Sequence, residues 1–182
     1  MIRSCFLAAA VGAALGAATL SAHAQGTAQQ GGGGPQSLSK HNDWEVAFLT
    51  EQGRRVCYVF TREVKSEGAP AGRTAPVVTV THRGSSRDQV ALLAGITFAA
   101  STEVPVEVGE AKFQFYSGGS SAFARDGAAV VAAFRRGREA VFRIPAAGGR
   151  AAVTDRASLR GFSAAYDALG RCAGGGAAPQ RR

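Results

Sequence analysis

The sequence has few of the residues on which enzyme active sites usually depend. Only three cysteines and three histidines occur among 182 residues, and no Cys-x-x-Cys pair is present, which argues against thiol-redox catalysis. No Gly-x-Ser-x-Gly element marks the nucleophile of an α/β-hydrolase. A zinc site needs three or four ligands, and beyond residue 24 the histidines are His41 and His82, far apart in the chain. We therefore expect no catalytic residue, no metal and no cofactor.

A weak catalytic alternative involves the serines of one loop. Ser85 and Ser86 lie close in sequence to His82 and Asp88, so a nucleophile and a base occur near each other. Serines beside glycine are more often turn formers. We favour that structural role.

A membrane-spanning apolar run is also missing. Residues 6–20 are apolar apart from Thr19, which is shorter than the roughly 20 residues of a membrane span. Arg3 precedes the run, and Ala22-His23-Ala24 follows it with the small-x-small pattern that signal peptidase accepts. We predict that residues 1–24 are a signal peptide. The mature chain would be exported to the periplasm or cell surface and have no transmembrane segment.

Two cysteines remain after the signal peptide, which contains Cys5, is removed. In an oxidising compartment Cys57 and Cys172 most simply pair with each other. Such a bridge would restrict the unfolded chain by about 4–5 kcal/mol in the chain-entropy model. The alternative is two buried, unpaired thiols.

Acidic residues are outnumbered by basic ones, 13 against 21, and the net charge is +8. A basic surface attracts anionic lipid, lipopolysaccharide phosphates or nucleic acid, and the export signal argues against nucleic acid. The densest basic cluster consists of Arg135, Arg136 and Arg138. It is a candidate anion- or partner-binding patch. Alternatively, these charges complement the dipole of a preceding helix.

Composition and alternation divide the chain into a linker, a domain and a tail. Residues 25–41 are rich in Gly, Gln and Ser, with too little apolar surface to become ordered, and are predicted to be a flexible linker. Residues 42–173 are the predicted domain, and residues 174–182 a disordered tail. Alternating or β-branched segments predict strands at 43–49, 55–61, 76–82, 89–98, 103–108, 111–116, 121–124 and 139–144.

Two further segments have helical patterns. Residues 126–136 begin with Asp, end with Arg and are followed by Gly137. Residues 158–172 have Ser158 as a candidate N-cap. The apolar residues of this second segment share one helical face: Leu159, Phe162, Tyr166 and Leu169. Short strands with two short helices, one of them C-terminal, predict a mainly β fold of the β-sandwich type.

Several motifs point to a known family. They are Phe123 with Asp126, Arg136-Gly137-Arg138, Thr154-Asp155 before Ser-Leu-Arg-Gly-Phe, the closing Cys172, Asp43-Trp44 and Cys57-Tyr58. Over roughly residues 43–172 the chain resembles the invasion-associated locus B family. The resemblance implies an exported immunoglobulin-like β-sandwich with a role in host-cell invasion in some pathogens. It supplies no active-site residue. Unlike many members, this chain has no cysteine soon after the early tryptophan, so we expect no second bridge.

The sequence thus predicts a non-enzymatic binding or interaction domain of the bacterial envelope. Its candidate partners are envelope or host proteins and anionic lipid or lipopolysaccharide. The alternative is a periplasmic enzyme or small-ligand-binding protein whose site has no recognisable motif. A deep cleft lined by convergent polar side chains would favour that alternative.

Overall fold

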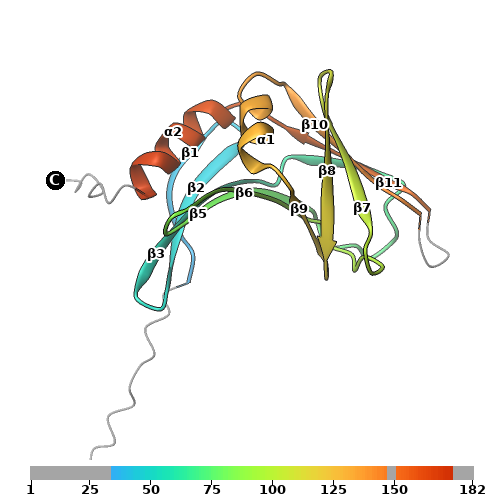
Figure 1. Cartoon of the computed structure of the whole chain (residues 1–182), viewed down its shortest axis with the longest axis horizontal. Coiled ribbons are helices and arrows are strands. Elements are labelled where there is room, and N and C mark those ends of the chain that lie inside the picture. The colour runs from blue at the N-terminus through green and yellow to red at the C-terminus, as the bar shows by residue number, and fades with distance from the viewer. Residues whose placement is uncertain (1–33, 147–150, 174–182) are drawn as a thin grey trace, which may run out of the picture. The chain divides into compact units, whose positions relative to one another are not determined.

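The computed structural model describes residues 34–146 and 151–173, which form eleven strands and two helices (Figure 1). In chain order the elements are β1 (Gln36–His41), β2 (Trp44–Glu51), β3 (Arg54–Thr61), β4 (Val64–Glu67), β5 (Val77–Arg83), β6 (Ser86–Leu93), β7 (Glu103–Val108), β8 (Ala111–Gly118), β9 (Ser121–Ala124), α1 (Gly127–Phe134), β10 (Glu139–Ile144), β11 (Val153–Ser158) and α2 (Phe162–Ala173). Within these residues no helix is long and apolar enough to span a membrane. The predicted signal peptide and C-terminal tail lie outside the described residues.

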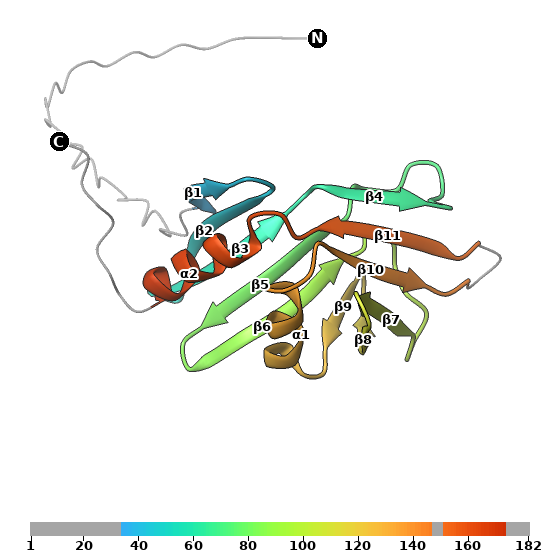
Figure 2. The same ribbon diagram turned by 90° about the horizontal axis from the view of Figure 1, so that it is seen from above.

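All strands belong to one antiparallel sheet with the order β1-β2-β3-β5-β6-β9-β8-β7-β10-β11-β4. Only Arg62 and Glu63 separate β3 from β4, yet β3 pairs with β2 and β5 whereas β4 pairs with β11. Because β3 and β4 are continuous in the chain but distant in the strand order, the sheet has to curl back on itself (Figure 2). The mainly β prediction is correct. The immunoglobulin-like sandwich is not confirmed, because a sandwich requires two separate sheets.

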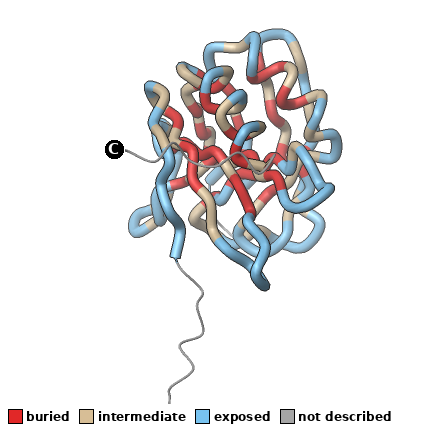
Figure 3. Tube along the Cα trace, turned by 90° about the vertical axis from the view of Figure 1, so that its left-hand side faces the viewer, coloured by how far each residue is buried: buried red, intermediate tan, exposed pale blue. Residues whose placement is uncertain are grey.

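One face of the curled sheet forms the core. Along β5, for example, Val78 and Val80 are fully buried while Thr79 between them is partly exposed, as alternation along a strand requires. Both helices cover this inner face, α1 over β6 and α2 over β2 and β3 (Figure 1). Buried positions accordingly lie in the interior, and exposed ones follow the outer loops and hairpins (Figure 3).

Aromatic rings join the helices to the sheet. Phe162 of α2 lies edge-on to Trp44 of β2, with ring centroids 4.9 Å apart, and edge-on to Phe134 of α1 at 5.3 Å. The indole Nε1 of Trp44 donates a hydrogen bond to the carbonyl oxygen of Ser158, 2.9 Å away. These contacts place Phe162 and Trp44 in the core, where both are fully buried.

Helix α2 is restrained at both ends. Just before it, Gly161 has φ +92°, and a Cβ at this position would overlap the carbonyl oxygen of His41, so only glycine fits without strain. Near the other end, Cys172 forms the predicted disulfide with Cys57, with 6.1 Å between the Cα atoms. The helix begins later than predicted. Ser158 is not its N-cap but the last residue of β11, and its hydroxyl donates to Asp43 Oδ2 over 2.7 Å.

The eight predicted strands correspond to β2, β3 and β5–β10, but β1, β4 and β11 were missed. Strand β1 lies within the predicted linker 25–41. It has little apolar surface and is ordered by backbone pairing with β2, which composition does not reveal. Strand β11 places a carboxylate, Asp155, at a core-facing position. That charge masks the apolar alternation by which a strand is recognised.

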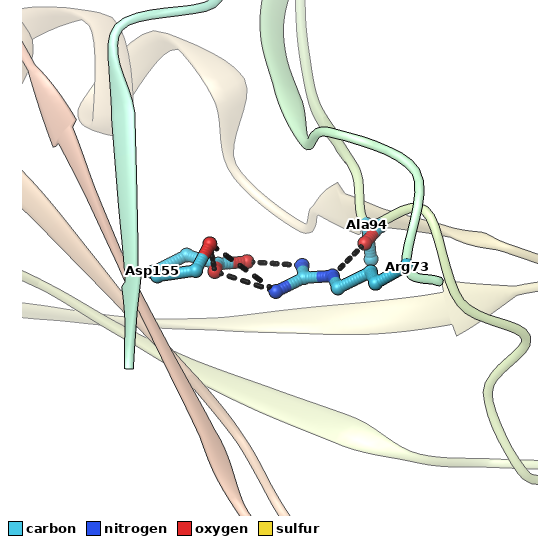
Figure 4. A network of polar contacts seen from close by, with 4 residues as sticks. Arg73, Ala94 and Asp155 are labelled. Carbon is cyan, nitrogen blue, oxygen red and sulfur yellow. Dashed lines mark hydrogen bonds and ion pairs between the residues drawn. The ribbon is translucent and has the colours of Figure 1, made fainter. Parts of the chain in front are cut away.

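Asp155 is buried because it is paired with an arginine from a distant loop. The side chains of Asp155 and Arg73 are 0% and 3% exposed. The guanidinium of Arg73 donates to Asp155 Oδ1 over 2.8 Å and to Oδ2 over 2.5 Å, and its Nε donates to the carbonyl oxygen of Ala94 over 2.6 Å (Figure 4). Ser66 of β4 adds a hydrogen bond to Oδ1 over 2.6 Å. This network, the buried ion pair, joins β11 and β4 to the segments flanking β5 and β6.

We expect Arg73→Met to lower the free energy of unfolding by about 3–5 kcal/mol, because it leaves the Asp155 carboxylate buried without a counter-charge. The double variant R73M/D155L also removes the buried carboxylate and should recover much of that lost stability. Denaturant unfolding measures both. Arg125→Gln is the control, since its ion pair with Glu103 is solvent-exposed and removing it should cost about 0.5 kcal/mol or less. Equal losses for R73M and R125Q would contradict the role of the buried pair.

Candidate binding groove

The three arginines of the predicted basic patch have different surroundings. They follow α1, whose N-cap Asp126 accepts a hydrogen bond from the backbone N–H of Ala129. Arg135 pairs with Asp167 of α2 over 2.8 Å, and its guanidinium lies over the Tyr166 ring, 5.3 Å from the centroid. Arg136 is exposed. Only Arg138 lines a groove.

The groove has a volume of about 700 Å³, and its lining includes the first residues of β4 and β10 and the last residues of β11. Its walls are mainly charged. The cations are Arg62, Lys65, Arg138, Arg156 and Arg160, and the acids are Asp43, Glu63 and Glu139. The basic residues come from three separate parts of the sequence, 62–65, 138 and 156–160, so no local cluster indicated the groove. Of its cations the sequence predicted only Arg138.

Ion pairs hold part of this lining in place. Arg160 donates to Asp43 Oδ1 over 2.9 Å, and Ser158 donates to Oδ2 of the same carboxylate. The hydrogen bond from Arg160, followed by that from Ser158, lowers the pKa of Asp43. Elsewhere in the lining, Arg156 donates to Glu139 Oε1 over 3.1 Å. These pairs neutralise two cations and two acids.

The remaining cations are available to a ligand. Within the described residues, the side chains of Arg138 and Lys65 make neither a hydrogen bond nor an ion pair. Arg62 stacks over the Phe60 ring at 4.5 Å, a contact that leaves guanidinium N–H groups free to donate. Glu63 is the one remaining acid, so unpaired positive charge exceeds unpaired negative charge in the groove.

The second arrangement that could support catalysis centres on the buried His82, which is close in sequence to Ser85 and Ser86. His82 is 3% exposed, and its Nδ1 lies 3.2 Å from the Arg87 guanidinium. Because a guanidinium only donates, Nδ1 accepts, and Nε2 carries the hydrogen donated to Asp88 Oδ1 over 3.0 Å. Both ring nitrogens are therefore occupied. Among the described residues no serine hydroxyl bonds to His82, so the serine–histidine alternative is not supported.

This histidine cluster attaches α2 to the β5–β6 hairpin. The hydroxyl of Tyr166 in α2 donates to the same Asp88 Oδ1 over 2.5 Å, and the Tyr166 ring lies edge-on to His82 with 5.6 Å between centroids. Burial, then the hydrogen bond to Asp88, raises the pKa of Tyr166 to about 12. The cluster has a structural role. Within the described residues no group of three or more metal-ligating side chains occurs either.

The raised pKa of Tyr166 predicts a loss of stability in alkali. The folded state retains the phenol proton up to about pH 12, whereas the unfolded state loses it near pH 10.0. The contribution is therefore complete below pH 10.0 and declines as the pH rises toward 12. Tyr166→Phe should flatten this decline. Denaturant unfolding of both proteins across this range measures it, and identical slopes would contradict the assignment.

Together, the fold and the groove define a mainly β protein built on one curled sheet. A disulfide joins β3 to α2, and the surface carries an open, charged groove. The chain belongs to the Invasion associated locus B (IalB) protein family, whose model matches residues 44–170. The resemblance inferred from the sequence motifs is thereby confirmed.

A solved structure supports the fold. The chain is similar to the crystal structure of invasion associated protein b from Bartonella henselae, with a TM-score of 0.51 and 22% sequence identity. The match covers 74% of this chain and 94% of that chain. At this identity the likeness concerns the fold alone. Comparison with curated proteins found no match.

Proposed function

We propose that this chain is an exported, non-enzymatic binding domain of the bacterial envelope. The observation that carries the proposal is the groove: it is open, its lining is charged, and several of its cations lack a partner within the described residues. Such a surface suits recognition of a charged partner. Candidate partners are envelope or host proteins and anionic lipid or lipopolysaccharide.

The side chains around the groove support binding rather than catalysis. Ser158 is the one hydroxyl residue in the lining, and its proton is donated to Asp43, which belongs to the ion pair with Arg160. A serine nucleophile needs a base that can accept its proton during the reaction. A carboxylate held by Arg160 with a lowered pKa is a weak base. The lining therefore lacks an activated nucleophile.

Export is supported by the predicted signal peptide and by the Cys57–Cys172 disulfide, since structural disulfides persist in oxidising compartments. We further propose that the protein contributes to contact with host cells. It is supported by the names of the family and of the solved relative, both of which contain the words "invasion associated".

The compartment and the bridge can be tested together. After fractionation of the producing bacterium, we expect the protein in the periplasmic or surface fraction, shortened by the signal peptide. Non-reducing peptide mass spectrometry of that material should detect Cys57 linked to Cys172. A cytoplasmic protein that retains its leader and has two free thiols would refute the proposal.

The contribution of the disulfide to stability can be measured on the purified protein. Replacing both cysteines by serine should lower the free energy of unfolding by up to about 4–5 kcal/mol, because the unfolded chain regains the freedom of a long loop. Denaturant unfolding of the oxidised protein and the double variant gives the difference. Equal stability would show that the disulfide does not restrain the fold.

A further inference from the structure

The groove presents two kinds of unpaired polar group to one ligand. Positive charge comes from Arg138 after α1, Lys65 of β4 and Arg62 at the break between β3 and β4. Unpaired negative charge comes from Glu63, which follows Arg62 directly, whereas Glu139 is already paired with Arg156. A ligand that fills this groove therefore has to satisfy cations and carboxylates together.

We propose that the groove binds a phosphorylated sugar. This inference rests on the proposed binding function and names its ligand class. A phosphate ester accepts charge-assisted hydrogen bonds from guanidinium and ammonium groups. Sugar hydroxyls donate hydrogen bonds, and carboxylates accept them. A ligand with charge but no donors would leave Glu63 unsatisfied and close to its own negative charge.

The dimensions of the groove agree with this ligand class. Its volume of about 700 Å³ lies within the roughly 300–1,000 Å³ typical of small-molecule sites. One or two sugar rings with a phosphate would fit that space. A neutral, apolar ligand would leave the charged walls without partners, which costs binding free energy.

The backbone around Arg138 is held in place before any ligand arrives. The carbonyl oxygen of Arg138 accepts a hydrogen bond from the Leu159 N–H over 3.0 Å, and the Gly137 N–H donates to Ala133 over 2.8 Å. A Cβ on Gly137 would overlap the side chain of Val108, so the turn is packed directly on β7. Preorganisation of this kind reduces the entropic cost of binding.

Calorimetric titration of the purified, oxidised protein with glucose 1-phosphate tests the proposal. We expect binding that weakens with added salt, because the phosphate is held by charges. Arg138→Gln should weaken it about tenfold, since one charge-assisted hydrogen bond is lost. Adding Lys65→Gln should weaken it further. Both side chains lack partners within the described residues, so thermal unfolding should be unchanged.

Arg54→Gln is the matched control. Arg54 is an exposed arginine at the β2–β3 hairpin, and it is not among the residues lining the groove, so the variant loses the same charge without altering the site. Glucose and inorganic phosphate are the ligand controls. Glucose has the sugar hydroxyls without the phosphate, and inorganic phosphate has the charge without the sugar. Each should therefore bind more weakly than glucose 1-phosphate.

A second titration distinguishes a soluble ligand from a membrane glycolipid. Vesicles containing lipid A present a phosphorylated disaccharide at a surface, and phosphatidylcholine vesicles are their reference. Binding that depends on Arg138 but not on Arg54, in either titration, supports the proposal and identifies the source.

The proposal is overturned if neither probe binds. It is also overturned if R54Q and R138Q weaken binding equally, or if inorganic phosphate binds as tightly as its sugar ester. None of these measurements depends on where the cell places the protein. A failed titration therefore leaves the proposed export intact, and a cytoplasmic location would leave the groove chemistry intact.

Discussion

The curled sheet depends on one interaction, the buried ion pair between Arg73 and Asp155. The Arg73–Asp155 pair is buried inside the curled sheet, where it joins β11 and β4 to the loop that precedes β5. Desolvating two charges is costly and is offset only when the geometry is good and the remaining polar atoms are satisfied. Here the fork of Arg73, the hydroxyl of Ser66 and the carbonyl of Ala94 meet those conditions. An arrangement of the same strands that separated Arg73 from Asp155 would leave a buried charge without its counter-charge, which is strongly destabilising.

The groove is a consequence of the way in which the sheet curls back on itself. Its walls are the ends of β4, β10 and β11 together with the turns beside them, and β4 reaches β11 only because the sheet bends back. Lys65 pairs in register with Arg156, so two like charges lie next to each other on neighbouring strands. Glu139 and Glu67 balance Arg156, which leaves Lys65 available. The way the strands pair thus determines which cations of the groove lack a partner.

Sequence patterns predicted the elements better than their assembly. The alternation of β7 and β10 and the helical spacing of α2 arise from burial against a core, so they are visible in the chain. Strand β1 is ordered by backbone hydrogen bonds to β2, and such bonds leave no mark in side-chain composition. The single sheet was missed because β4 and β11, its last two strands, have few apolar residues and a buried charge.

Local sequence was sufficient to predict the family, the mainly β class, the C-terminal helix and the pairing of Cys57 with Cys172. Each of these follows from short motifs, from periodicity, or from there being only two cysteines beyond the predicted signal peptide. Folding was needed to establish that Arg138 faces a groove while Arg135 is occupied by Asp167 and Tyr166. Neighbouring arginines differ in this way because ion pairs form between residues that are close in space, and sequence separation does not specify that distance.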